Sequence, residues 1–245
     1  MKVLATYNIK GGVGKTSTAV NLAYLSAREG RRTLLWDLDP QAAATYVFRV
    51  RPRIKGGGHA LVSRRRPLEA ALKATDFDNL DLLPADFSYR NMDLELDDTK
   101  KRTRRLGQLL GSVADDYDVV FLDCPPSISL VSENVMHAAD SLLVPLIPAT
   151  LSLRTFDQLV RFVEDSHGSH PEVVAFFSMA DRRKRLHREV IDTIPREGTR
   201  VANTVIPALS IIEQMAERRA PVPAFAPTSR AARCYEELWA EVCPT

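Results

Sequence analysis

The chain has 245 residues, of which 45% are hydrophobic, and a formal net charge of +2 at pH 7. This length and apolar content predict a single domain over residues 1–245 with a substantial core. The near-neutral charge excludes a global field that would attract a polyanion, so such an affinity has to come from local patches. Three cysteines without metal-type spacing argue against a disulfide framework or a zinc site.

Short apolar runs rich in β-branched residues alternate with helix-compatible stretches. The runs lie at 3–7, 33–36, 80–83, 119–122, 142–146, 173–177 and 201–206. This alternation predicts an α/β fold, in which a mostly parallel, twisted, doubly wound sheet carries helices on both faces. No apolar run approaches the roughly 20 residues of a membrane-spanning helix, and no segment before the first run resembles a signal peptide, so we expect a cytoplasmic protein without a membrane partner.

Two segments are read from their local pattern. Residues 49–67 carry seven Lys or Arg residues and the glycines 56–58 without apolar periodicity, which predicts a mobile basic loop within the domain. Near the C-terminus, Tyr235, Leu238 and Trp239 are followed by Val242 at helical spacing. That spacing predicts a helix packed on the core.

A glycine-rich loop follows the first apolar run. Its glycines let backbone N–H groups converge on phosphate oxygens, and the helix that follows adds the positive end of its dipole. Lys15 would neutralise the β- and γ-phosphates, and the Thr16 hydroxyl would bind Mg²⁺. The sequence therefore predicts a site for ATP or ADP with Mg²⁺. The nucleotide-binding residues of the loop are Gly11, Gly12, Val13, Gly14, Lys15, Thr16 and Ser17.

Two further runs end in carboxylates. Asp123 follows residues 119–122, and Asp37 and Asp39 follow residues 33–36. Ligands of open α/β sheets bind at the carboxyl ends of strands, where these side chains are expected to meet. Asp123 is placed to hold Mg²⁺ directly or through water. A carboxylate of the other pair could orient the attacking water or join the Mg²⁺ shell, and a helix-capping or solvated acid is the alternative.

Together these motifs resemble a known family. Residues 10–16 look like the deviant Walker A motif of the ParA/MinD family, residues 37–41 like its switch I, and residues 123–127 like its Walker B and switch II. Stretches at 180–187, 206–207 and 219–222 are similar to the ParA branch, so the resemblance covers nearly the whole chain. Two positions depart from the pattern: Ala42 stands where many relatives have glycine, and Cys124 where threonine is frequent.

The resemblance implies an ATPase that forms a homodimer with ATP. Lys10 is then the signature lysine, which reaches the phosphates of the partner's nucleotide, and Asp39 positions the attacking water. The implied catalytic residues are Lys10, Lys15 and Asp39, and the implied metal-binding residues are Thr16, Asp37 and Asp123. Adenine contacts are expected around Ser178 and 207–209, with Pro207 among the nucleotide-binding residues.

Basic residues gather at 49–66, 100–105 and 182–188. The first two clusters are explained equally well as solvated faces. In the ParA branch, basic residues of the C-terminal half contact DNA phosphates without reading sequence, and such contacts make binding salt-sensitive. The resemblance thus implies double-stranded, nonspecific DNA as a partner. The candidate DNA-binding residues are Arg182, Arg183, Lys184, Arg185, Arg188, Arg218 and Arg219.

The function implied is an ATP-dependent switch that segregates or positions a plasmid, chromosome or other cargo on the nucleoid with a ParB-like or adaptor protein. A MinD-like membrane role is disfavoured because the C-terminal segment is acidic, not basic. The alternatives are a metabolic P-loop ligase or kinase, such as a dethiobiotin synthetase-like enzyme, and an accessory ATPase for cargo positioning or cellulose synthesis. Electron transfer of the nitrogenase iron-protein kind needs cluster-ligating cysteines, for which the cysteine spacing gives no support.

Overall fold

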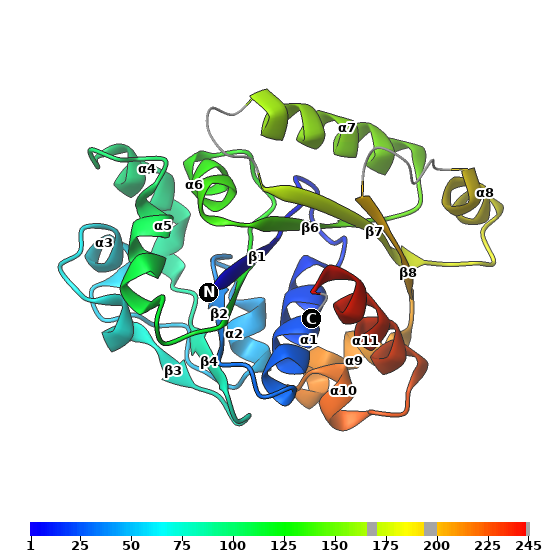
Figure 1. The fold of residues 1–245 in the computed structure, drawn as a ribbon, viewed down its shortest axis with the longest axis horizontal. Coiled ribbons are helices and arrows are strands. Elements are labelled where there is room, and N and C mark those ends of the chain that lie inside the picture. Colours follow the sequence, from blue (N-terminus) through cyan, green and yellow to red (C-terminus); the bar gives the residue numbers. More distant parts are fainter. Residues whose placement is uncertain (166–170, 194–199, 244–245) are drawn as a thin grey trace.

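The computed structural model describes residues 1–165, 171–193 and 200–243. These residues form a central sheet with helices on both of its faces (Figure 1). The strands are β1 (Lys2–Thr6), β2 (Thr33–Asp37), β3 (Lys73–Ala74), β4 (Leu80–Leu83), β5 (Val119–Asp123), β6 (Ser141–Leu146), β7 (Glu172–Ala180) and β8 (Arg200–Pro207). The helices are α1 (Lys15–Arg28), α2 (Ala43–Val47), α3 (Gly57–Val62), α4 (Met92–Asp97), α5 (Arg105–Leu110), α6 (Leu130–Ala138), α7 (Thr150–Asp165), α8 (Arg185–Thr193), α9 (Ser210–Arg218), α10 (Val222–Phe225) and α11 (Arg230–Val242). Short 3-10 turns lie at Leu68–Ala71, Phe87–Asn91 and Gly111–Val113.

The strand order across the sheet is β3-β4-β2-β5-β1-β6-β7-β8. Every pairing is parallel except that of β3 with β4, which is antiparallel at one edge. The predicted α/β fold is thus confirmed, and each predicted apolar run overlaps one of the parallel strands. Strand β3 was not predicted, because its two residues are exposed and provide no apolar run.

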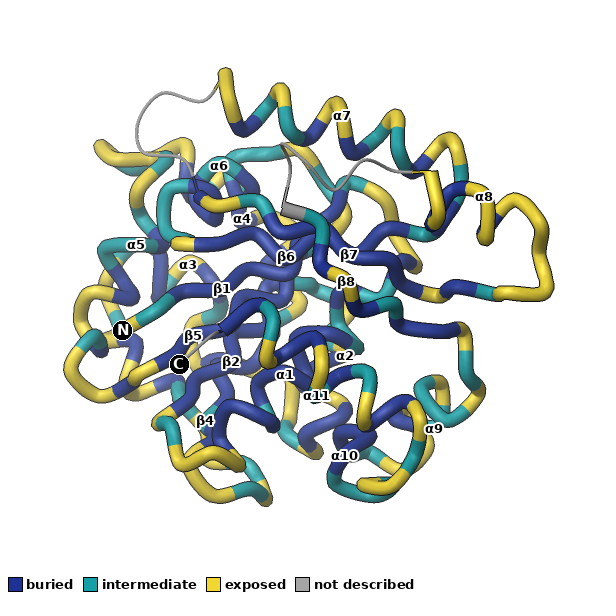
Figure 2. The backbone as a smooth tube through the Cα atoms, turned by 45° about the vertical axis from the view of Figure 1, so that its right-hand side comes forward, coloured by how far each residue is buried: buried dark blue, intermediate teal, exposed yellow. Residues whose placement is uncertain are grey.

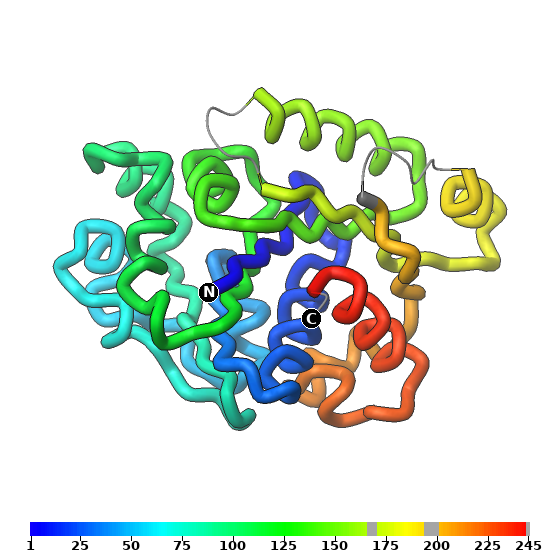
Figure 3. The backbone as a smooth tube through the Cα atoms, in the orientation of Figure 1, coloured from blue at the N-terminus to red at the C-terminus, as the bar shows by residue number. Residues whose placement is uncertain are grey.

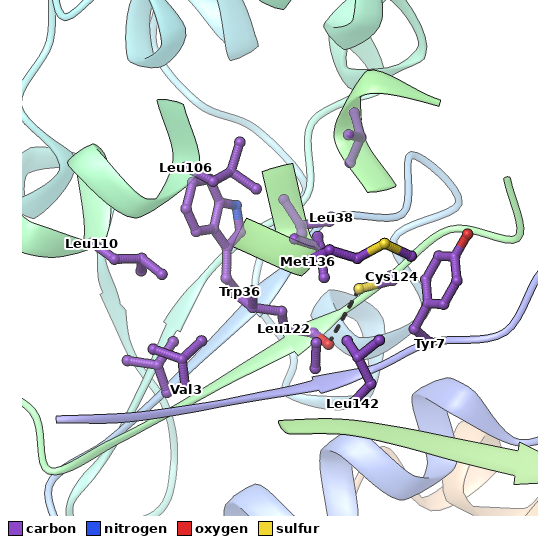
Figure 4. Packing of buried hydrophobic residues seen from close by; sticks show 14 of the residues in the cluster. Val3, Tyr7, Trp36, Leu38, Leu106, Leu110, Leu122, Cys124, Met136 and Leu142 are labelled. Atoms are coloured by element: carbon purple, nitrogen blue, oxygen red, sulfur yellow. Dashed lines mark hydrogen bonds between the residues drawn. The ribbon is translucent and has the colours of Figure 1, made fainter. Parts of the chain in front are cut away.

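Alternate residues of each strand face opposite layers of the core. In β1, Val3 belongs to the core layer formed with the helices α3 to α8, whereas Leu4 belongs to the layer formed with α1, α2 and α9 to α11. Figure 4 shows part of the first layer, with Trp36 of β2 beside Leu106 of α5. Both faces of the sheet are therefore covered by apolar side chains, and the functional carboxylates Asp37 and Asp123 stand at strand ends.

The C-terminal helix packs beside the N-terminal one. Figure 3 traces the chain from β1, in the middle of the sheet, to α11, which contacts α1 and β8. Tyr235, Leu238, Trp239 and Val242 are all buried. The predicted core helix is confirmed. No helix among the described residues is long and apolar enough to cross a membrane.

Residues 49–67 differ from the predicted basic loop, because they contain helix α3. Ile54, Leu61 and Val62 are buried in the core layer. A Cβ atom at Gly58 would lie 2.9 Å from the ring of Tyr89, so a glycine is needed for this close packing. The prediction of a loop was wrong at this helix. Its glycines were interpreted as helix breakers, but Gly57 is the first residue of α3 and Gly58 packs against Tyr89.

Candidate functional site

The glycine-rich loop joins the central strand β1 to helix α1 at the carboxyl edge of the sheet. Gly12 and Gly14 have φ values of 69° and 97°, in the left-handed region that favours glycine. A Cβ atom at Gly14 would lie 2.7 Å from the Ser178 hydroxyl, so this position excludes a side chain. The loop therefore presents backbone N–H groups and the start of a 14-residue helix to a ligand, which is the arrangement that binds phosphate.

Lys15 and Lys10 occupy different environments in this loop. The Lys15 side chain is buried, and its Nζ donates a hydrogen bond to the Lys10 carbonyl oxygen at 3.0 Å. Burial lowers the pKa of Lys15, and the nearby Asp123 partly offsets that effect. Lys10 is exposed, and only its backbone is fixed, by donation of its N–H to Asn8 Oδ1 at 2.9 Å. Among the described residues, Lys10 takes part in no ion pair.

Asp37 and Asp123 end neighbouring strands in the same register and are both fully buried. Burial raises the pKa of Asp37 to about 6, although Thr45 donates both its hydroxyl (2.7 Å) and its backbone N–H (2.8 Å) to Asp37 Oδ2. Burial and the adjacent Asp37 raise the pKa of Asp123 well above its usual range, and the Thr16 hydroxyl partly offsets this rise.

Among the side chains of the site, the Asp123 carboxylate is the one best suited to bind a metal ion. Its Oδ2 is buried without a hydrogen-bond partner in the described structure, and such an atom is costly to bury unless a cation or donor meets it. The Thr16 hydroxyl lies beside it. Hard oxygen ligands of this kind are those that Mg²⁺ prefers when it binds together with phosphates. The residues present therefore fit Mg²⁺.

Asp39 is held differently from Asp37. It is partly exposed, its Oδ1 accepts the Gln41 N–H at 2.9 Å, and its own N–H donates to Asp37 Oδ1 at 3.2 Å. The turn thus fixes the backbone at Asp39, while the side chain stays partly exposed. Ala42, three residues later, has a φ of 57°, which explains why a glycine suits this position.

A cavity of about 240 Å³ opens beside the loop. Gly12, Gly14 and Ser17 form its phosphate side. Ser178 and Pro207–Leu209 line it as well, so the region expected to contact adenine lies against the loop. The remaining lining residues are Met179, Ile206, Ile212, Glu213 and Tyr235.

Several residues of the site were missed by the sequence reasoning. Thr45 lies in α2, and Asn8 precedes the loop with its Nδ2 donating to the Pro145 carbonyl at 2.8 Å. Met179 and Glu213 line the cavity from β7 and α9. Asn8 stands just before the loop, so its position in the sequence could have identified it. For the other three no local pattern gives a signal, because their partners come from distant parts of the chain.

The basic residues at 182–188 lie in the turn after β7 and on α8. Arg183 and Arg185 have side chains that are 92% and 85% exposed. Arg183 Nε pairs with Asp181 Oδ1 at 2.9 Å, and Arg185 Nε pairs with Glu189 Oε1 at 2.6 Å. Figure 2 shows this turn and α8 standing out from the rest of the chain. Exposed pairs of this kind contribute little to stability, so these side chains remain available to an external anion.

Arg218 and Arg219 lie elsewhere, at the end of α9. Arg219 donates its Nε to the Tyr46 carbonyl oxygen at 3.0 Å, and its guanidinium lies 4.5 Å from the centre of the Tyr46 ring. The Arg218 carbonyl accepts from Arg49 at 3.3 Å. Helices α8 and α9 are separated in both Figure 1 and Figure 2, so one protomer does not join the two basic groups.

Comparison with known proteins identifies relatives of this chain. A family model described as AAA domain matches residues 1–173. The chain is 32% identical over 247 residues to the sporulation initiation inhibitor protein Soj of Bacillus subtilis, covering 98% of both chains. It is 32% identical over 250 residues to the chromosome partitioning protein ParA of Caulobacter vibrioides, covering 99% of this chain and 94% of that one.

A solved structure supports the same relationship. A crystal structure of cobyrinic acid a,c-diamide synthase from Mycobacterium smegmatis with bound ADP and magnesium matches with a TM-score of 0.80 and 29% identity, covering 98% of this chain and 92% of that one. ATP or ADP and Mg²⁺ are accordingly the ligands of this protein, and it is an ATPase. The matching motifs, the near-complete coverage by its relatives and the shared fold place the chain in the ParA/MinD family of ATPases.

Proposed function

We propose that this ATPase is a dimerisation switch that binds DNA without sequence preference when ATP is present. It hydrolyses ATP slowly and, in the cytoplasm on the nucleoid, segregates or positions a plasmid, chromosome or other cargo with a ParB-like or adaptor protein. The names of its relatives, Soj and ParA, support this role. The observation that carries the proposal is the contrast between the buried Lys15 and the exposed Lys10 of the same loop.

Each residue of the nucleotide site takes one task in this proposal. Lys15 and the N–H groups of 11–17 hold the phosphates, while Pro207 and the cavity beside it receive the adenine. Thr16, Asp37 and Asp123 hold Mg²⁺, which neutralises charge on the β- and γ-phosphates. The partly exposed carboxylate of Asp39 orients the attacking water.

Lys10 acts on the other protomer's nucleotide. Lys15 already supplies a cation to the phosphates in cis, and its Nζ is held by the hydrogen bond to the Lys10 carbonyl. The exposed Lys10 side chain therefore serves a different purpose. A cation delivered in trans stabilises the charge of the transition state only when two protomers meet. Hydrolysis is thereby coupled to the dimer state.

The DNA contacts are proposed for both basic groups. Arg182, Lys184 and Arg188 are exposed and take part in none of the ion pairs between described residues, so they are the strongest candidates. Arg183 and Arg185 would exchange an acidic partner for a phosphate. Arg219 is fixed by Tyr46, which makes Arg218 the better candidate at α9. A dimer would bring these groups from two protomers onto one duplex.

A metabolic ligase is the second candidate, because one structural relative carries the name of a synthase. Such an enzyme would consume ATP in proportion to the amount of small-molecule product that it forms. Its affinity for DNA would not depend on the bound nucleotide. An accessory ATPase for cargo positioning or cellulose synthesis shares the whole site and differs only in its partner.

The trans role of Lys10 is tested by mixing two inactive variants. Lys10→Ala keeps its own ATP site but supplies no trans cation, whereas Lys15→Ala supplies Lys10 but binds ATP poorly. The mixture can form one composite site, so it should hydrolyse ATP faster than the two variants measured separately. Wild-type activity per protomer should also rise with protein concentration, and that of Lys10→Ala should not. Lys10→Ala activity that matches the wild type at every concentration would overturn the proposal.

The DNA surface is tested by reversing charge at α8. Arg182→Glu combined with Arg185→Glu should weaken binding to random-sequence duplex and flatten its salt dependence, with basal ATP hydrolysis unchanged. Arg230→Glu combined with Arg233→Glu, the same charge change on exposed residues of α11, is the matched control. Equal effects of the two double variants would remove the special role of α8.

A further inference from the structure

A second cavity lies far from the nucleotide site, between helices α3, α4 and α5. Its volume is about 700 Å³, which is in the range of small-molecule sites. None of its lining residues belongs to the glycine-rich loop, the acidic strand ends or the adenine cavity. Figures 1 and 3 show these three helices grouped at the left of the view, apart from α1 in the centre.

The fold brings two basic segments together at this cavity. Arg64 comes from the segment that includes α3, whereas Lys100, Lys101 and Arg105 come from the segment between α4 and α5. These segments are about 40 residues apart in the chain, and each alone was explained equally well as a solvated face. Their convergence around one concave surface is a property of the tertiary structure.

The cations of the cavity exceed its acids. Four permanent cations face two carboxyl groups, those of Glu95 and Asp98, and His59 also lines the wall. Glu95 Oε2 is buried without a hydrogen-bond partner in the described structure, and burial raises the pKa of Glu95. The cavity therefore carries a positive potential that favours an anion.

Two guanidinium groups are fixed at the rim without an acidic partner. Arg105 Nε donates to the Val62 carbonyl oxygen at 2.5 Å, and Arg64 Nη2 donates to the Gln108 carbonyl oxygen at 3.3 Å. Neither arginine takes part in an ion pair between described residues. Burial and the proximity of Arg64 both lower the pKa of Arg105. An anion bound to both guanidinium groups would offset their mutual repulsion.

We propose that this cavity binds the phosphate groups of a small phosphorylated molecule, at a site separate from the ATPase centre. Planar guanidinium groups match phosphate oxygens in bidentate geometry, and the excess of about two positive charges suits a phosphate dianion or a diphosphate. A concave surface of this volume accepts a small molecule, whereas a DNA duplex, with its wide cylindrical surface, contacts exposed ridges.

The test uses inorganic pyrophosphate as the probe, with the full-length protein in saturating Mg-ADP so that the glycine-rich loop is occupied. Titration calorimetry should detect pyrophosphate binding to the wild type. Arg64→Gln combined with Lys101→Gln removes two exposed cations of the cavity and should weaken this binding about tenfold or more. Thermal unfolding of the variant should match that of the wild type, because both residues are exposed.

The matched control is Arg65→Gln combined with Arg102→Gln. These neighbours in sequence are also exposed and lie outside the cavity lining, so the same charge change should leave pyrophosphate binding within about twofold. The proposal is overturned if pyrophosphate does not bind in Mg-ADP, or if both double variants weaken it equally. It is also overturned if random duplex DNA displaces the probe and the cavity variant loses DNA affinity to the same extent.

Discussion

The nucleotide site and the basic turn before α8 hold their charged residues in opposite ways. At the nucleotide site, Lys15, Asp37 and Asp123 are buried and tied to strand ends and to α1. At the turn and the start of α8, Arg183 and Arg185 are exposed and pair, among the described residues, with acids a few positions away. Burial makes the charges of the first region interdependent, so single changes there should have large effects. Charges of the second region act through their sum, so single changes should have small effects.

Removing the buried lysine is expected to have the largest effect. Lys15→Ala deletes the cation that meets the phosphates and its hydrogen bond to the Lys10 carbonyl. Affinity for Mg-ADP should fall by about 100-fold, as measured by titration with a fluorescent ADP analogue. Lys10→Ala, in the same loop but exposed, should change it by less than about threefold. Equal losses in the two variants would contradict the division of labour between these lysines.

Replacing the Asp39 carboxylate should reduce hydrolysis without affecting ATP binding. Asp39→Asn keeps an oxygen that can accept the Gln41 N–H, so the turn is preserved while the carboxylate is lost. Hydrolysis should slow by about 100-fold, and the ATP-bound dimer should persist in size-exclusion chromatography. A variant that turns over at the wild-type rate would remove Asp39 from the mechanism.

Asp37 should make stability fall as pH rises from about 4 to about 6. Its folded-state pKa of about 6 lies above the unfolded value of about 3.9, so in this window the folded chain holds a proton that the unfolded chain has lost. Relative to the wild type, Asp37→Asn should therefore gain stability with rising pH, by at most about 1.4 kcal/mol per pH unit.

The measurement is urea unfolding of both proteins between pH 4 and 8 without nucleotide. Asp78→Asn, on the exposed surface, is the matched control. A stability difference between Asp37→Asn and wild type that stays constant or reverses over this window would show that burial does not set the titration of Asp37.

The smallest expected effect concerns the backbone after Asp39. Ala42→Gly relieves a left-handed conformation with a φ of 57° and should stabilise the protein by about 1 kcal/mol in chemical denaturation. Ala43→Gly, the next residue and the first of α2, should instead destabilise it by up to about 1 kcal/mol. If both substitutions change stability in the same direction, local strain at Ala42 is not the cause.

The sheet and the glycine-rich loop were predictable because both leave local signals. Buried parallel strands are continuous apolar runs, and a phosphate loop needs glycines at fixed spacing. Helix α3 was missed because its Gly58 packs against Tyr89, a contact between distant segments. Thr45 was missed for the same reason: its bonds to Asp37 exist only once α2 folds over the end of β2.

The basic residues illustrate the limit of reading charge from sequence. The clusters at 49–66 and 100–105 looked alike as solvated faces, yet residues of both line one cavity. Arg219, expected to contact DNA, is fixed by Tyr46. Exposed charges leave no periodicity, so their spatial grouping comes only from the fold.

The most direct test of the central claim is binding of random-sequence duplex DNA with ATP, ADP and no nucleotide, across a salt series and beside size-exclusion chromatography. The account predicts a dimer that binds DNA at least about tenfold more tightly with Mg-ATP than with ADP or without nucleotide, with an affinity that falls steeply as salt rises. A DNA-binding midpoint that is the same in all three nucleotide states would contradict it.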